Sequence, residues 1–174
     1  SIYIIGSIIT TGILLSASKI LEKLGLFKFT WYVLILELLS IIGMFITNSP
    51  FLIACYFTVH HVVISLLYFN MDIYIEKTSP NKEFEGSIRA TYLTISNLTI
   101  IFAPTIVSFL VIGKYYGYVY MLSALFLVPV FYLINKFKHI KADRMKHVNI
   151  RETIAGYTSD KNLYNVFITN FILQ

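Results

Sequence analysis

The feature that most constrains this chain is a succession of apolar runs, each close to the ~20 residues with which an α-helix crosses the hydrocarbon core of a bilayer. Hydrophobic residues make up 57% of the 174 residues and charged residues only 13%, which leaves too few charges to cover a water-soluble surface. Backbone polar groups cannot stay unpaired in hydrocarbon, so runs of this kind fold as helices. The sequence therefore predicts an all-α, polytopic transmembrane bundle.

The runs divide the chain into spans and connections. Five full spans are predicted, over residues 2–21, 30–47, 51–72, 88–112 and 116–135. A basic polar linker follows at 136–162, and residues 163–174 begin another apolar run that ends about half a span short. The chain starts within an apolar stretch, without the charged region and cleavage site of a signal peptide. We therefore expect it to be an internal fragment of a longer membrane protein.

Lysine and arginine residues concentrate in alternate connections between these spans. Thirteen of the 14 lie within 19–28, 77–89 and 136–161, and only Lys114 lies in a connection on the opposite side. By the positive-inside rule, loops 19–28, 73–88 and 136–162 are cytoplasmic, which predicts an integral protein of a cell membrane, plasma or inner. Clusters of this kind account for the net charge of +5 without a nucleic-acid-binding face.

Polar residues inside the predicted spans are the candidate functional residues, because each must find a partner or water within the bilayer. Glu37 lies near the middle of the second span, on one helical stripe with Val33, Ser40, Met44 and Thr47. A carboxyl group at this depth either pairs structurally with another polar group or carries a proton during transport. Both interpretations of Glu37 stay open.

The third span carries a longer polar stripe in steps of three and four residues, formed by Ala54, Thr58, His61, Ser65, Tyr68 and Asp72. His61 is the second titratable candidate, because imidazole exchanges protons near neutral pH. The predicted substrate or proton pathway comprises Glu37, His61, Ser65, Asp72 and, from the fourth span, Asn97. Hydroxyl and amide groups in spans also bond other helices or their own backbone, which is the structural alternative.

A metal site is not predicted in the third span. His60 lies about 100° around the helix from His61, so the two imidazoles cannot face one metal ion without distortion. No motif indicates a cofactor either.

Two prolines interrupt the predicted helices, Pro104 in the fourth span and Pro129 in the fifth. Proline lacks a backbone N–H and its ring clashes with the preceding turn. Each proline therefore predicts a helix kink, which is tolerated in a membrane where neighbouring groups satisfy the freed carbonyl.

The first basic connection carries a motif. It reads Ser18-Lys19-Ile20-Leu21-Glu22-Lys23-Leu24-Gly25-Leu26-Phe27-Lys28. This resembles the loop between the second and third helices of the major facilitator superfamily, usually written G-x-L-A-D-R-x-G-R-K-x. The resemblance assigns four residues to a cytoplasmic gate: the acid Glu22, the base Lys23, the turn glycine Gly25 and the positive charge Lys28. Three positions depart from the family's pattern: Ser18, Leu26 and Phe27.

A second likeness runs from Asn70 to Pro104, where YIEKTSP precedes EGSIRATYLTISNLTIIFAP. It is similar to the stretch from the end of the family's fourth helix through its fifth, which opens with a basic residue, here Arg89. The resemblance leads us to expect that Glu76 or Glu85 pairs with Arg89 at the inner surface. Ala103-Pro104 lies where the family's antiporters carry a Gly-Pro pair, but the flanking glycines are missing, so the resemblance leaves symport, antiport and uniport open.

The resemblance covers nearly the whole chain, with the five spans corresponding to the family's helices two to six and residues 163–174 to the start of helix seven. It implies about twelve helices in two halves around a midplane site, with alternating access. The chain would be most of one half, and its partner would be the missing second half of the same transporter. The function it implies is secondary active transport of a small solute. The sequence leaves the solute unnamed and proton coupling open.

Two other classes of function compete with transport. A membrane-embedded enzyme is disfavoured, because neither G-x-S-x-G nor H-E-x-x-H occurs and no acidic partner follows His60 and His61 at useful spacing. A non-transporting scaffold or receptor on the same fold would have no need of buried titratable groups. The two candidates therefore differ in what neutralising Glu37 and His61 should do to activity.

Overall fold

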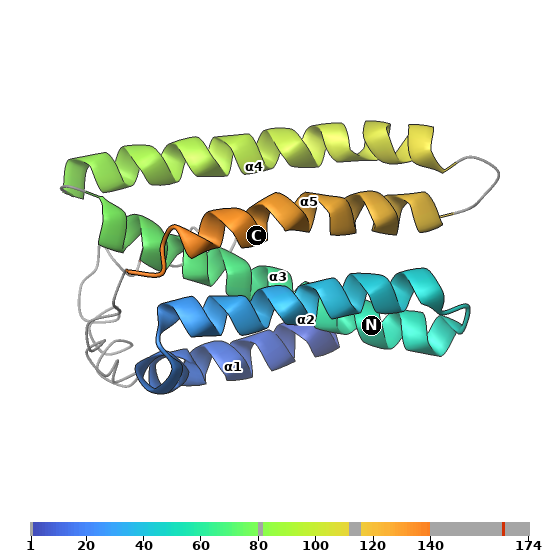
Figure 1. The fold of residues 1–174 in the computed structure, drawn as a ribbon, viewed down its shortest axis with the longest axis horizontal. Coiled ribbons are helices and arrows are strands. Elements are labelled where there is room, and N and C mark those ends of the chain that lie inside the picture. Colours follow the sequence, from blue (N-terminus) through green and yellow to red (C-terminus); the bar gives the residue numbers. More distant parts are fainter. Residues whose placement is uncertain (1, 80–81, 112–115, 140–164, 166–174) are drawn as a thin grey trace. The chain divides into compact units, whose positions relative to one another are not determined.

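The computed structural model describes residues 2–79, 82–111, 116–139 and Asn165. Over these residues the protein is helical and contains no strand. Five helices follow one another along the chain (Figure 1): α1 (Ile2–Leu24), α2 (Leu26–Ile46), α3 (Pro50–Thr78), α4 (Lys82–Leu110) and α5 (Gly117–Asn135). All five belong to the first of two compact units, residues 1–142 and 143–174. The predicted all-α bundle is confirmed.

Among the described residues, four helical stretches are long and apolar enough to cross a membrane: Leu26–Ile46, Pro50–Thr78, Phe84–Leu110 and Gly117–Asn135. In α1 the apolar stretch Ile2–Ala17 is shorter, so a fifth span remains a prediction. Large apolar side chains are exposed along these helices, for example Ile46 at 70% and Phe109 at 75%. Such a surface aggregates in water but suits contact with acyl chains or further helices, which makes the chain a membrane-embedded protein.

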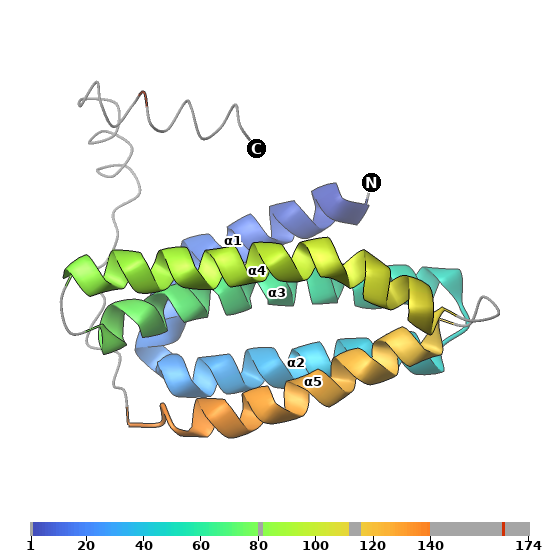
Figure 2. The same ribbon diagram turned by 90° about the horizontal axis from the view of Figure 1, so that it is seen from above.

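The helix α2 is the centre of the bundle. It packs mainly against α3 and α5, whereas α1 packs mainly against α3, and Figure 2 shows α2 beside α5. Of the apolar window in α2, 44% is buried, against none of the window in α4. Because lipid is as apolar as leucine, close packing and polar contacts, more than hydrophobic burial, must hold these helices together. The side chains that decide this packing therefore lie on α2 and its two neighbours.

Two glycines allow aromatic rings of α3 to lie directly on the neighbouring helices. A Cβ added at Gly43 of α2 would meet three ring atoms of Tyr56 at 2.6–2.7 Å, and one added at Gly6 of α1 would meet the His61 ring at 2.7 Å. Real Cβ atoms essentially never approach other atoms that closely. These ring-on-glycine contacts help to set the register of α3 against α1 and α2.

The helices extend beyond the predicted spans at several ends. In the predicted connection 19–28, α1 continues to Leu24 and α2 begins at Leu26, so only Gly25 separates them. Within 73–88, α3 continues to Thr78 and α4 begins at Lys82. The span boundaries remain predictions, because hydropathy marks where the bilayer ends, whereas Lys and Glu are good helix formers and let the helix continue beyond it.

Pro104 and Pro129 lie inside α4 and α5, which continue past them. The kinks that these prolines predict remain predictions. The linker beyond residue 139 and the start of a further span at 163–174, Asn165 excepted, lie outside the described residues.

Gly25 has backbone angles that other residues rarely adopt, with φ 77° and ψ 151°. An L-residue in this region costs roughly 1–3 kcal/mol. Replacing Gly25 with alanine should therefore destabilise the bundle by about that amount, although an added Cβ would meet no atom within 4 Å. Thermal unfolding in detergent measures the loss, with Gly86→Ala, a helical glycine with open space around it, as the control. If Gly25→Ala lost no more stability than Gly86→Ala, the predicted backbone strain at position 25 would be contradicted.

Candidate functional site

Glu37 of α2 meets His60 of α3 at the interface of the two helices. The His60 Nδ1 and the Glu37 Oε1 are 2.6 Å apart and form a hydrogen bond. The Glu37 side chain is 5% exposed and that of His60 is 26% exposed. Four residues of the predicted stripe, Val33, Glu37, Ser40 and Met44, are buried together on α2, whereas Thr47 is only half-buried at the C-cap of the helix. A carboxyl and an imidazole are thus paired between two helices that are each long enough to cross a membrane.

The second carboxyl oxygen of this pair, Glu37 Oε2, is buried and has no hydrogen-bond partner among the described residues. Buried polar atoms without a partner are rare. A neutral imidazole donates from one ring nitrogen and accepts at the other. If Nδ1 carries the hydrogen, His60 donates to Glu37, and if Nδ1 accepts, a protonated Glu37 donates to His60. With neutral imidazole and ionised carboxyl the pair has a net charge of −1, and one added proton makes it neutral. The pair therefore joins a carboxyl and an imidazole, two side-chain types whose chemistry includes both a protonated and a deprotonated form.

His61, the imidazole singled out from the sequence, faces α1. Its ring lies on Gly6 and makes an edge contact with Tyr3, with ring centroids 5.6 Å apart. The carboxyl partner is the adjacent histidine, His60, which sequence reasoning missed as a functional residue. Both histidines are half-buried in the same span. The polar stripe favoured His61, whereas the register of α3 against α2 places His60 at the carboxyl.

The other polar residues of the predicted α3 stripe bond mostly within α3 itself. The Thr58 hydroxyl donates to the Ala54 carbonyl at 2.8 Å, and the Ser65 hydroxyl donates to the His61 carbonyl at 3.1 Å. This is the structural alternative for hydroxyl groups in a membrane helix. On α4, Asn97 is exposed.

Arg89 connects α3 and α4 through carboxylates on both helices. Its Nε lies 3.2 Å from Asp72 Oδ1 and its Nη2 lies 3.4 Å from Glu85 Oε1. The Nε–H is not aligned for a hydrogen bond, so the Asp72 contact is an ion pair by distance alone. Glu85, expected as a partner, is confirmed, whereas Glu76 is exposed and the α3 partner is Asp72. Asp72 therefore lies in a helix-to-helix ion pair at this end of the bundle.

The remaining predicted gate residues lie at the junction of α1 and α2. Glu22 and Lys23 are exposed at the end of α1, and Lys28 is exposed in the first turns of α2. Gly25 lies between them at positive φ. The junction has the turn glycine that the predicted gate needs, whereas Glu22, Lys23 and Lys28 form no ion pair within the described part of the chain.

Asn70 is a buried polar residue that sequence reasoning did not select. Its side chain is 1% exposed, and neither amide atom has a hydrogen-bond partner among the described residues. It lies on the buried face of α3 with Leu66, Ile73 and Tyr74, away from the polar stripe. Its only sequence signal was an amide in an apolar span, which a search for regular polar stripes passes over.

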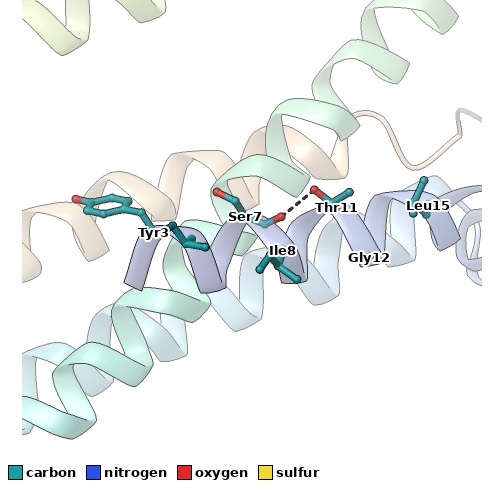
Figure 3. A pocket seen from close by; sticks show the side chains of 7 residues that line it. Tyr3, Ser7, Ile8, Thr11, Gly12 and Leu15 are labelled. Carbon is teal, nitrogen blue, oxygen red and sulfur yellow. Dashed lines mark hydrogen bonds between the residues drawn. The ribbon is translucent and has the colours of Figure 1, made fainter. Parts of the chain in front are cut away.

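One hollow, of about 600 Å³, lies along α1 and is lined by α1 residues alone (Figure 3). The Thr11 hydroxyl there donates to the Ser7 carbonyl at 2.8 Å, as the dashed line in Figure 3 shows. The remaining lining includes Tyr3, Ile8 and Leu15, which are exposed. This is an open helix face and has no group placed to hold a polar ligand.

The Glu37–His60 pair is thus the one site in the described residues where two titratable side chains from different transmembrane helices meet below the surface. The Arg89 contacts differ, because Arg89 and Asp72 are 43% and 45% exposed. Comparison of the chain with protein-family models, with curated proteins and with solved structures finds no match.

Proposed function

We propose that this chain is part of a secondary active transporter in which the Glu37–His60 pair carries a proton. The observation that carries the proposal is a carboxyl group, 5% exposed, bonded to an imidazole between two helices that can each cross a bilayer. Ionisable groups inside a membrane are costly and mark ion or proton pathways in most proteins that keep them. The resemblance of 18–28 and 70–104 to the major facilitator superfamily supports the same class of function.

The chemistry follows from the charge of the pair. Without the added proton the pair has a net charge of −1 in an apolar interface, and with it the pair is neutral. Moving a net charge through a low-dielectric region is unfavourable, so the neutral pair is the form suited to a change of access. The buried Oε2 is the atom at which a further donor, from solute or solvent, can reach the carboxyl. Loading a proton and changing access are then linked.

The test is transport by the intact protein in liposomes that contain a pH-sensitive dye. Radiolabelled amino acids, sugars, nucleosides and organic cations are screened for uptake driven by a proton gradient. Glu37→Gln and His60→Gln should each reduce gradient-driven accumulation about tenfold or more, while solute exchange without a gradient continues. His139→Gln, an exposed histidine after α5, is the matched control and should accumulate solute normally.

The pattern of loss distinguishes a proton carrier from a structural pair. If exchange and accumulation fell together, Glu37 would support the fold and not coupling. If gradient-driven accumulation persisted in both variants, the pair would be excluded from the proton pathway. If the intact protein moved neither proton nor solute, a non-transporting scaffold would replace the proposal.

A further inference from the structure

Another cavity lies between α2 and the end of α5, and neither Glu37 nor His60 is among the residues that line it. Its volume is about 380 Å³, and Lys28, Trp31 and Tyr32 of α2 line it together with Asn135 and Lys138 from the end of α5. The two helices pack against each other, so residues about a hundred positions apart form one site.

The cavity is positively charged. Lys28 of α2 and Lys138, in the turn that follows α5, both line it, and no aspartate or glutamate is among the side chains that do. Lys136 lies beside it in sequence, with its Nζ 5.6 Å from the centre of the Tyr132 ring. The Asn135 side-chain amide donates to the Phe131 carbonyl at 2.9 Å, which leaves its oxygen as an acceptor. The field at this cavity therefore favours an anion.

The walls are aromatic and apolar. Trp31 packs between Phe27 and Phe131, with ring centroids 6.3 and 5.0 Å from its own. Its indole Nε1 is buried and has no hydrogen-bond partner among the described residues. Ile35, about one turn further into α2 than Trp31, is exposed at 40% and continues the apolar wall toward the middle of the span. The cavity thus has positive charge at one end and an apolar surface at the other end. These features match a molecule that has an anionic head and an acyl tail.

We propose that this cavity binds the phosphate headgroup of an anionic phospholipid, with Lys28 and Lys138 at the phosphate and Trp31, Tyr32 and Ile35 along the glycerol and upper acyl chain. Tryptophan and tyrosine prefer the headgroup region, and basic pockets between helices hold anionic headgroups. A free phosphate ion would gain the charge contacts but no advantage from the apolar wall. The proposal concerns the α2–α5 interface and is independent of the proposed proton site.

Trp31 is the single tryptophan of the chain, so its fluorescence reports on this cavity directly. The protein is reconstituted in phosphatidylcholine containing a fixed fraction of brominated phosphatidylglycerol or, in parallel, brominated phosphatidylcholine. Bromine quenches tryptophan on contact. We expect a relative binding constant about tenfold or more in favour of phosphatidylglycerol, because each lysine near the surface adds to the attraction for an anionic lipid.

Single variants identify the groups responsible. Lys28→Gln and Lys138→Gln should each lower the preference several-fold, Lys28→Arg and Lys138→Arg should keep it, and Lys19→Gln, an exposed lysine of α1, should leave it unchanged. The arginine variants also show that the fold tolerates substitution at both positions. Equal quenching by the two brominated lipids in the unaltered protein would overturn the proposal. A preference that vanished on addition of millimolar inorganic phosphate would overturn it in favour of a free anion.

Discussion

Replacing His60 with leucine is expected to destabilise the bundle by about 3–5 kcal/mol, and replacing Glu37 with leucine by less. The difference arises from exposure. Without His60, the Glu37 carboxyl, 5% exposed, remains in an apolar interface with no partner, whereas without Glu37 the imidazole, 26% exposed, can still reach polar surroundings. The double leucine variant should be nearly as stable as the original protein, because both polar groups leave together.

A double-mutant cycle of unfolding in detergent measures these differences. Thr58→Val is the matched control, because the Thr58 hydroxyl bonds only to its own helix and its loss should cost about 1 kcal/mol or less. Two single effects that add up in the double variant would show that Glu37 and His60 do not act as a pair. The cycle tests the contact itself and is independent of any transport assay.

Replacing Gly43 with alanine is expected to destabilise the bundle by about 1–3 kcal/mol. The Tyr56 ring packs directly against Gly43. The new methyl group would lie 2.6 Å from Cε1 and Cζ of this ring, which is too close. Either the ring or the whole of α3 must move, and α3 also carries His60. The change should therefore lengthen the Glu37–His60 contact and reduce coupled transport together with stability.

Gly12→Ala is the matched control, because Gly12 is also inside a helix but has no atom within 4 Å of an added Cβ. It should stabilise its helix slightly, by up to about 1 kcal/mol, because alanine has the higher helix propensity. Exchanging Tyr56 for leucine in the Gly43→Ala background should recover part of the lost stability. Equal effects of the two glycine substitutions would mean that the ring contact at Gly43 does not hold α3 in register.

The sequence predicted where the five described helices lie along the chain, but not where each one begins and ends. Apolar runs of membrane length located all five helices, because the runs reflect a local requirement of the bilayer. The connection at 19–28 was expected to be a loop, yet a single glycine, Gly25, interrupts an otherwise helical stretch. Hydropathy cannot locate such ends, since a helix continues into the interface wherever its residues have adequate propensity.

The candidate site was likewise predicted only in part from the sequence. The periodicity of α2 was sufficient to place Glu37 on a buried stripe with Ser40 and Met44, because the facing of side chains within one helix depends only on spacing. The Asp72–Arg89 ion pair and the unpartnered Asn70 were not expected, since each depends on which helix lies opposite.

From the amino-acid sequence alone it follows that this chain is an all-helical membrane protein with a carboxyl group inside its second helix. Only the tertiary structure decided that His60 and not His61 meets that carboxyl, and that Lys28 and Lys138 share one cavity. The physical reason is register. Contacts between helices depend on how side chains such as Tyr56 settle on glycines of a neighbour, and no spacing within a single helix contains that information.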